Sequence, residues 1–349
     1  MVFSSDGIWF ASGSSDRTIR IYRAADGNPI VTVTNGTAEV LNIALTTIGT
    51  LVSWDSADVL RVWQIPGGSL LRTQAIPSIG GYGFSATGDL FAAGGDIWSV
   101  ADGNRTFTFS SSAYQRPVFS PNGELLGVGL SLAEEYEIEI WRLTDGLLLR
   151  RLTNYHSGIS LNGAPVFLPD STSIAVLTGP YGATEIWAIA SGSLRGFIPE
   201  ETASPGQSLI KLLVFMPNGT VGIMSDRDDK IRMWRIKEGQ EAARLALYDA
   251  QTAGISALAM SPKAGLYGYG RQDGKVFVAR VPVFITEARL SAGQFITQWL
   301  GGSGLYQLQQ STNLSSDSWD NVGSPTTNTD VTNNVSGGSF FYRVQSLPN

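Results

Sequence analysis

Apolar and polar residues alternate along most of this chain, and the alternation recurs in seven similar copies between residues 3 and 283. Each copy holds a short apolar run, a turn rich in Pro, Asp, Asn and Gly, a second apolar run, and an alternating segment that ends in an aromatic residue. The clearest copies are residues 118–123 followed by 138–141, and residues 214–219 followed by 231–234. Because side chains in a strand point alternately to its two faces, the pattern predicts short β-strands throughout.

The aromatic residue that ends each alternating segment measures the repeat. The aromatic residues that end successive copies are 35 to 47 residues apart. They are Tyr22, Trp63, Trp98, Trp141, Trp187 and Trp234, and Ala279 occupies the corresponding position in the seventh copy. Two-residue signals such as Asp26-Gly27 and Asp102-Gly103 follow them and predict tight hairpin turns. A repeat of about 40 to 45 residues suits a four-stranded propeller blade. We therefore predict an all-β, seven-bladed β-propeller over residues 1–283, with each aromatic packed between neighbouring blades.

The first copy is shorter than the others. Only Met1, Val2 and Phe3 precede its turn, whereas residues 210–215 form a full apolar run in the sixth copy. We expect the first blade to be incomplete at its N-terminal side, the strand that would close the ring to be missing, and the open reading frame to begin further upstream. The alternative is that residues 283–290 fold back to complete the seventh blade.

The composition changes after Pro282, where Ser, Thr, Asn and Gly become dominant. Alternating segments still occur at residues 294–299, 306–310 and 340–344, with glycine pairs between them. These segments predict a small β-sandwich over residues 284–349. A disordered tail is the alternative, and the aromatic residues at alternating positions argue against it.

The repeats over residues 1–283 resemble the WD-repeat family in a divergent, bacterial form. A turn aspartate precedes the third strand of each blade in that family, and the matching residues here are Asp16, Asp58, Asp96, Asp229 and Asp273. The family's hydrogen-bonded network of Asp, His, Ser and Trp is expected to be absent, because the chain has a single histidine. The resemblance implies a propeller and no specific partner.

The C-terminal segment resembles a fibronectin type III-like module of exported bacterial proteins. The residues that carry this resemblance are Trp299, Trp319 and the ranges 306–309, 311–314 and 341–344. It implies an extracellular, cell-surface or periplasmic location, with a signal peptide expected upstream of Met1.

Charge and composition argue against several classes of function. The net charge is −6 and no run of Lys or Arg occurs, so we expect no nucleic-acid partner. No apolar stretch reaches the roughly 18 residues of a membrane span. The chain has no cysteine and one histidine, and no phosphate-binding loop or nucleophile motif. The acids of residues 226–229 lack the glycine and distal glutamate of a calcium loop. We therefore expect no cofactor and no metal.

The candidate binding residues lie in loops. In a WD-type blade, the loops between repeats and the loops before the third strand share one face, which would carry Tyr114, Arg116, Tyr155, His156, Tyr181 and Arg227. Tyr and Arg are enriched at interaction surfaces. His156 has no carboxylate nearby in sequence that would support a role as general base. We predict a non-enzymatic interaction scaffold whose loops bind a protein or glycan.

The alternative function is a propeller hydrolase or lyase that acts on polysaccharide. The wall of the central channel distinguishes the two hypotheses. Converging carboxylates would favour the enzyme, and an apolar or uniformly solvated wall would favour the scaffold.

Overall fold

A computed structural model describes residues 1–76, 80–109, 114–131, 136–154, 165–177, 183–199, 210–226, 230–236, 240–249, 254–262, 265–291, 294–302, 305–312, 319–334 and 341–347. Within these ranges the regular structure consists of β-strands, in agreement with the predicted all-β class. The described residues include no helix that is long and apolar enough to cross a lipid bilayer.

Among the described residues, seven antiparallel sheets follow one another between residues 2 and 280, and we number them in chain order. Sheet 1 comprises β1 (Val2–Phe3), β2 (Trp9–Gly13), β3 (Thr18–Arg23) and β4 (Pro29–Thr34), and sheet 2 comprises β5 (Val40–Leu45), β6 (Thr50–Asp55), β7 (Val59–Gln64) and β8 (Leu70–Ala75). Sheet 3 comprises β9 (Tyr82–Phe84), β10 (Leu90–Ala93), β11 (Asp96–Ser99) and β12 (Arg105–Thr108), and sheet 4 comprises β13 (Tyr114–Phe119), β14 (Leu125–Ser131), β15 (Tyr136–Arg142) and β16 (Leu147–Asn154).

The remaining sheets of this region are similar. Sheet 5 comprises β17 (Val166–Phe167), β18 (Ser173–Leu177), β19 (Thr184–Ala188) and β20 (Leu194–Ile198), and sheet 6 comprises β21 (Ile210–Phe215), β22 (Val221–Asp226), β23 (Lys230–Arg235) and β24 (Ala243–Asp249). Sheet 7 has three strands among the described residues, β25 (Ile255–Met260), β26 (Leu266–Arg271) and β27 (Val276–Arg280). Consecutive strands pair in every sheet, so each sheet is a simple meander.

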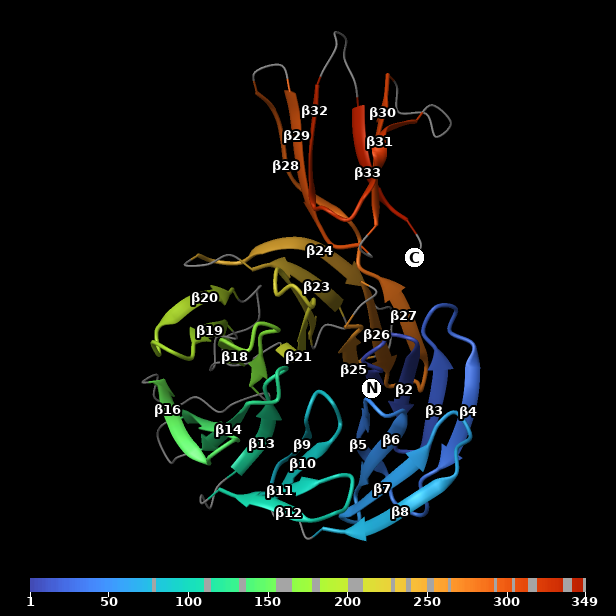
Figure 1. The fold of residues 1–349 in the computed structure, drawn as a ribbon, viewed down its shortest axis with the longest axis vertical. Helices are drawn as coiled ribbons and strands as arrows, with labels where there is room; N and C mark the ends of the chain where they lie inside the picture. Colours follow the sequence, from blue (N-terminus) through green and yellow to red (C-terminus); the bar gives the residue numbers. More distant parts are fainter. Residues whose placement is uncertain are drawn as a thin grey trace.

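The sheets are arranged around a common centre, with the first strand of each sheet innermost (Figure 1). Contacts link β1 to β5, β5 to β9, β9 to β13 and β13 to β17, and they also link β21 to β25 and β25 to β1. The ring is therefore continuous on its inner side at the junction of sheets 7 and 1. This architecture is that of a β-propeller.

The structure corrects the prediction for the first sheet. Val2 and Phe3 are enough to form its innermost strand, because they pair with Ala11 and Phe10 of β2. The place that lacks a strand among the described residues is the outer edge of sheet 7. The alternative, in which residues 283–290 complete sheet 7, is wrong, because β28 (Phe284–Ser291) pairs with β29 (Gln294–Leu300) instead.

Hairpin turns between the third and fourth strands follow the predicted Asp-Gly signals. Gly27, Gly103 and Gly146 have φ angles of 72°, 77° and 69°, a region that glycine adopts without steric cost. In the turn of sheet 3, a carboxylate oxygen of Asp102 accepts a hydrogen bond from the Asn104 backbone N–H at 3.0 Å. The same contact recurs in sheets 1 and 4.

The aromatic residues at the ends of the third strands pack between sheets, as the sequence predicts. Trp63 of sheet 2, for example, belongs to one apolar cluster with Ile21 and Val33 of sheet 1. In all six sheets that have a fourth strand, the register between the third and fourth strands shifts directly before the aromatic residue. Such a bulge increases the local twist of the strand and turns the aromatic side chain towards the preceding sheet.

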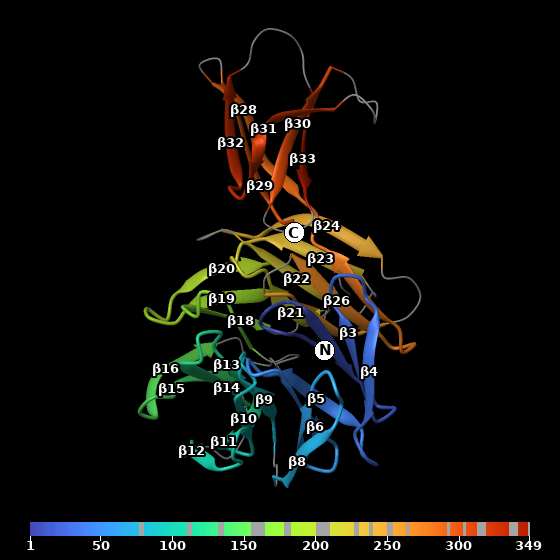
Figure 2. The same cartoon turned by 45° about the vertical axis from the view of Figure 1, so that its right-hand side comes forward.

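The described residues after the ring form two three-stranded sheets. One contains β28, β29 and β32 (Asp330–Asn334), and the other contains β30 (Tyr306–Ser311), β31 (Asp320–Thr326) and β33 (Phe341–Ser346). Aromatic rings join them: Phe295 stacks on Tyr342 with ring centroids 3.9 Å apart, and Trp299 meets Tyr306 edge-on. In both views these strands stand above sheets 6 and 7 (Figures 1 and 2). Phe284 packs against the apolar cluster that joins those two sheets.

We predict that Trp54→Ala lowers the free energy of unfolding by about 3–5 kcal/mol. Trp54 is 1% exposed, and its ring lies 4.7 Å from that of Phe91, so the substitution leaves a cavity between sheets 2 and 3. The control is Ile48→Ala, at a residue that is 78% exposed. Urea unfolding of the three proteins measures the effect, and equal midpoints for Trp54→Ala and wild type would contradict the packing described above.

A pH dependence follows from the turn of sheet 3. Hydrogen bonds from the backbone N–H of Asn104 and from the Ser99 side chain lower the pKa of Asp102 from its ordinary 3.8 to about 2. The lowered pKa means that the carboxylate stabilises the folded state above pH 4 and that this stabilisation is lost as the pH falls towards 2. Wild type should therefore exceed Asp102→Ala in urea midpoint at pH 7, with a smaller difference at pH 3. A pH-independent difference would show that the charge of Asp102 does not contribute.

Candidate functional site

The six residues predicted to form the binding face lie outside the part of the chain whose side chains the structure describes. Tyr155, His156, Tyr181 and Arg227 fall in the gaps between described ranges. The backbone of Tyr114 and Arg116 belongs to β13, the innermost strand of sheet 4, rather than to a loop. The predicted binding face therefore remains a prediction for all six residues.

A cavity of about 580 Å³ lies among the innermost strands of the described region, and we call it the central channel. Five innermost strands and the residues beside them line it, so sheets 2 to 6 each contribute to one site. The lining residues are Leu41, Asn42, Tyr82, Gly83, Phe84, Pro117, Val118, Phe119, Pro121, Pro165, Val166, Phe167, Leu212 and Leu213. No signal in the sequence brings these short segments together, because the channel forms only when the sheets surround a common centre.

The side chains of the described channel wall are mainly apolar, whereas polar atoms make up about half of its exposed surface. Asn42 and the hydroxyl of Tyr82 are its polar side-chain groups, and none of the described lining residues is acidic or basic. Gly83 permits a close approach of two innermost strands, because a Cβ atom at this position would lie 2.3 Å from the carbonyl oxygen of Pro117. Such a wall suits contact with a partner surface that has both apolar and hydrogen-bonding groups.

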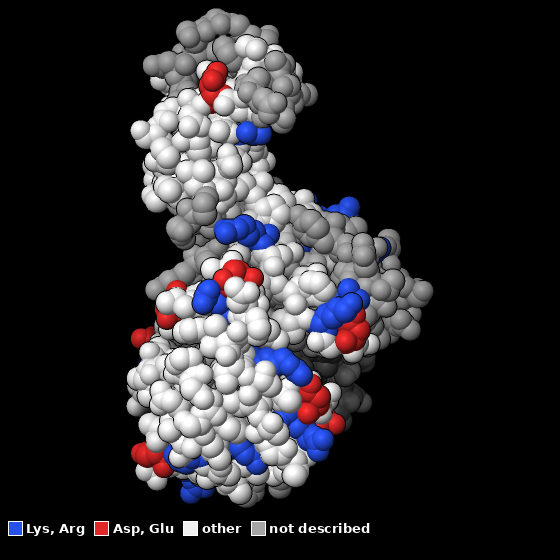
Figure 3. Space-filling view, turned by 90° about the vertical axis from the view of Figure 1, so that its right-hand side faces the viewer, with Lys and Arg blue, Asp and Glu red and all other residues white. Residues whose placement is uncertain are grey.

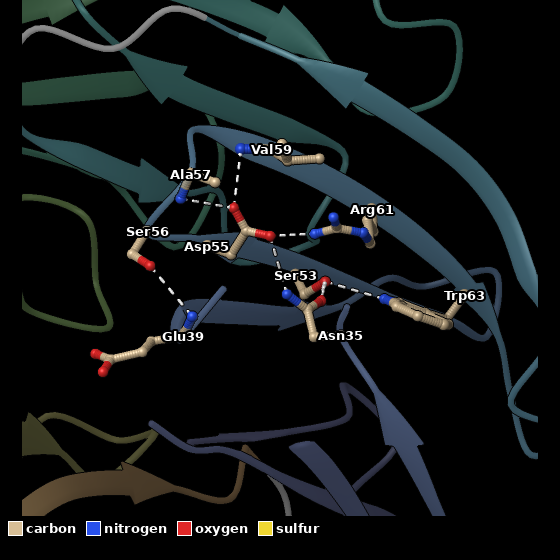
Figure 4. A network of polar contacts seen from close by, with 9 residues as sticks. All are labelled: Asn35, Glu39, Ser53, Asp55, Ser56, Ala57, Val59, Arg61 and Trp63. Atoms are coloured by element: carbon tan, nitrogen blue, oxygen red, sulfur yellow. Dashed lines mark hydrogen bonds and ion pairs between the residues drawn. The ribbon is translucent and has the colours of Figure 1, made fainter. Parts of the chain in front are cut away.

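Beside the channel, sheet 2 contains a buried polar network (Figure 4). Trp63 donates its indole N–H to Ser53 Oγ at 2.9 Å, and Ser53 donates its hydroxyl to Asn35 Oδ1 at 2.6 Å. Asn35 donates through Nδ2 to Asp55 at 3.1 Å, and Asp55 also forms an ion pair with Arg61. The side chains of Asn35, Ser53 and Asp55 are fully buried, and the chain of bonds satisfies each of them.

The sequence predicts that the family's network of Asp, His, Ser and Trp is absent, and the network of sheet 2 indeed contains no histidine but joins Asp55, Ser53 and Trp63 through an asparagine. Asn35 takes the place of the histidine, because an amide can donate and accept hydrogen bonds at once, as a neutral imidazole does. The carboxylate comes from Asp55 and not from the predicted Asp58. The sequence signal for this network is the pair Asn35-Gly36. It lies before β5, and the next strand, β6, carries Ser53 and Asp55.

The network also joins two loops of the predicted binding face. Asn35 lies between β4 and β5, whereas Asp55 begins the turn between β6 and β7 and accepts the backbone N–H groups of Ala57 and Val59. The backbone N–H of Glu39 donates to Ser56 Oγ at 3.1 Å across the same two loops. In sheet 2, therefore, the loop between repeats and the loop before the third strand meet, as the family resemblance implies.

In sheets 4 and 5 the indole N–H of the third-strand tryptophan has a different partner. Trp141 donates to Glu139 at 3.1 Å, and Trp187 donates to Glu185 at the same distance. Glu139 and Glu137 both pair with Arg151, which crosses from the neighbouring strand β16. This pair of buried carboxylates therefore has a structural partner, and neither residue lines the channel.

Charges elsewhere occur in small mixed groups on the face shown in Figure 3, where blue and red side chains lie next to each other. Ion pairs among the described residues include Arg20–Asp16 and Arg271–Asp273. No group of three or more His, Cys, Asp or Glu side chains suited to a metal ion occurs among the described residues.

We predict that Asp55→Asn lowers the free energy of unfolding by about 3–5 kcal/mol, the cost of leaving a buried charge without its partner. The substitution removes the counterion of Arg61, whose side chain is only 16% exposed. The control is Asp26→Asn, which breaks an exposed pair with Arg23 and should have a much smaller effect. Chemical unfolding at neutral pH measures both, and equal losses in the two variants would contradict the role assigned to the buried network.

Comparisons with known proteins agree with this fold. Residues 1–23, which span β1, β2 and β3, match the family described as WD domain, G-beta repeat. Among curated proteins, none matches the sequence. A chain of Kuenenia stuttgartiensis hydrazine synthase has a similar structure, with a TM-score of 0.67 and 14% identity over 80% of this chain and 94% of that chain. At this identity the likeness concerns the fold alone. Together, the sequence match and the shared fold support a relationship to the WD-repeat β-propellers.

Proposed function

We propose that this protein is a non-enzymatic interaction scaffold. In this proposal a seven-bladed β-propeller presents its channel mouth and the surrounding loops to a protein or glycan partner, and a fibronectin type III-like β-sandwich follows over residues 284–349. WD repeats generally mediate protein interactions, in keeping with the match to residues 1–23. The observation that carries the proposal is the described wall of the central channel, whose side chains are mainly apolar and include no acidic or basic group.

The wall favours binding over hydrolysis for a chemical reason. Glycoside hydrolysis uses two carboxyl groups placed about 5 to 10 Å apart on either side of the bond that breaks. The described lining residues provide no such pair. Elsewhere, the buried carboxylate of Asp55 is held by Arg61, and those of Glu137 and Glu139 are held by Arg151. These carboxylates stabilise the sheets in which they lie.

The contact residues proposed for the partner include the channel mouth as well as the predicted loop residues. Leu41 is 44% exposed at the start of β5 and lines the channel, so it can contact a bound molecule. Tyr155, His156, Tyr181 and Arg227 stay predicted contacts on sequence grounds, together with Tyr114 and Arg116. Export to the cell surface, periplasm or medium is part of the same proposal and is supported by the resemblance of the C-terminal segment to modules of exported proteins.

We expect Leu41→Asp to reduce partner retention at least fivefold, because a carboxylate at the channel wall loses hydration when a partner covers it. The measurement compares immobilised full-length proteins exposed to a glycan array and to a cell-envelope protein fraction. The control is Ile48→Asp, which adds the same charge at a more exposed residue, in the turn at the other end of β5.

Two outcomes would contradict the proposal. One is equal retention by wild type and Leu41→Asp, which would place binding away from the channel mouth. The other is release of reducing ends from a polysaccharide panel by the wild-type protein above a heat-inactivated control, which would favour the hydrolase or lyase.

A further inference from the structure

A cavity of about 220 Å³ lies between sheets 5 and 6 and shares no described lining residue with the central channel. We call it the lateral pocket. The two sheets lie side by side in both views (Figures 1 and 2). From sheet 5, β19, β20 and the turn before β18 line the pocket, and from sheet 6 it is lined by the turn between β21 and β22 together with Ile236.

The lateral pocket lies beside a glycine that replaces a larger residue of the other sheets. Gly196 of β20 pairs with Ile186, the residue before the third-strand aromatic. In sheets 1 to 4 the fourth-strand residue with this pairing has a side chain that covers the hairpin glycine of the next sheet, since a Cβ atom on that glycine would lie 2.9 Å or less from it. These four residues are Val31, Arg72, Phe107 and Arg150. Gly196 has no side chain to place there, and it lines the pocket instead.

The bulge of β20 brings an arginine to the pocket. Arg195 is the extra residue of this bulge, since its two neighbours pair with β19 and it does not. Its Nη1 donates to Asp170 at 3.0 Å and to Ser173 Oγ at 2.7 Å. A bulge redirects the side chain that it carries. The extra residues of the other five bulges are uncharged, and they are Ile30, Leu71, Thr106, Leu149 and Leu245.

The wall formed by sheet 6 supplies hydrogen-bonding groups. Asn218 Oδ1 accepts hydrogen bonds from the backbone N–H and the hydroxyl of Thr220, at 3.1 and 2.8 Å. The amide nitrogen of Asn218 therefore points away from this contact and can donate to a bound molecule, while Thr220 Oγ1 can still accept. On the other wall, the carboxylate of Asp170 has more acceptor sites than its bonds to Thr172 and Arg195 use.

Apolar side chains form the floor of the pocket. Leu168 and Ile186 are 4% and 1% exposed, and both belong to the cluster that joins sheets 5 and 6. Ile236 packs against the same cluster. An apolar floor beside a few hydrogen-bonding groups suits a small molecule with an apolar face and polar edges.

Charge narrows the class of ligand. Burial raises the pKa of Asp170, but hydrogen bonds from Thr172 and Arg195 outweigh this effect and hold the pKa below its ordinary 3.8. Asp170 and Arg195 are therefore an ion pair at neutral pH. A bound anion would meet the charge of Asp170 and a bound cation that of Arg195, so the pair favours a neutral ligand.

Size narrows it further. The pocket volume corresponds to roughly seven water molecules of the liquid. This space suits one six-membered ring with its substituents and is too small for a folded partner.

We propose that the lateral pocket binds one neutral pyranose unit of a glycan. The C–H face of the sugar ring lies on Leu168 and Ile186. Its hydroxyl groups, which both donate and accept, bond to Asp170, Asn218 and Thr220. The site is separate from the central channel and does not rest on the function proposed for the channel.

The test adds the methyl glycosides of glucose, galactose, mannose and N-acetylglucosamine to the full-length protein, with isotope labels in its isoleucine and leucine methyl groups. At least one glycoside should shift the methyl signals of Ile186 and Ile236 in a saturable way, with a dissociation constant of the order of 1 mM. The signals of Ile48, which is 78% exposed, and of Leu41 in the central channel should not move.

A filled pocket provides the matching variant. Gly196→Phe gives β20 the residue that Phe107 provides in sheet 3, and it should weaken sugar binding at least tenfold. The control is Leu194→Phe, which adds a ring to the same strand at a residue that is 48% exposed and does not line the pocket. It should change affinity less than twofold. The methyl shifts of the wild-type protein keep the test independent of how well Gly196→Phe folds.

Four results would overturn the proposal. The first is absence of shifts at Ile186 and Ile236 with all four glycosides, and the second is shifts of equal size at Ile48 or Leu41. The third is equal affinity of Gly196→Phe and wild type. The fourth is a response of Ile186 and Ile236 to sodium acetate or ammonium chloride and to none of the sugars, which would identify a charged ligand.

Discussion

The packing of each sheet against the next is the interaction on which the rest of the structure depends. One four-stranded meander has two faces and cannot bury both, so its stability comes from its neighbours. The third-strand aromatic meets the fourth strand of the preceding sheet, as Trp63 meets Val33 and Trp234 meets Ile198. The bulge before each aromatic and the hairpin glycines serve this contact, because they set the twist that brings consecutive sheets together. The channel forms because the sheets surround a common centre, and no particular lining residue is required to form it.

Much of the fold could be predicted from the sequence, because the repeat is long and its strands alternate clearly. The third-strand aromatics and the Asp-Gly hairpins are local signals, and both lie where the pattern predicts them. The first strand was predicted wrongly for a physical reason. Two paired residues are sufficient when the strand is held between β2 and the neighbouring inner strands, and this support cannot be seen from Val2 and Phe3 alone.

The candidate site was less predictable. The channel wall is assembled from short segments of five sheets, so no local sequence pattern predicts it. The network of sheet 2 was not predicted from the sequence for two reasons. Asn35 occupies the position at which a histidine was expected, and Asp55 and Asp58 are only three residues apart. Asp55 is the buried one of the two and pairs with Arg61, an arrangement that is a property of the folded sheet.

The short strand β1 has a consequence for the order in which the molecule folds. Nearly all strand pairs of the ring join segments that are adjacent in sequence, whereas the contact of β1 with β25 joins residues about 250 positions apart. Local meanders can form and stack in any order, but this last contact closes a very long loop, and the entropic cost of closure grows with the logarithm of its length. We therefore expect the junction of sheets 7 and 1 to be the last part of the ring to assemble during folding.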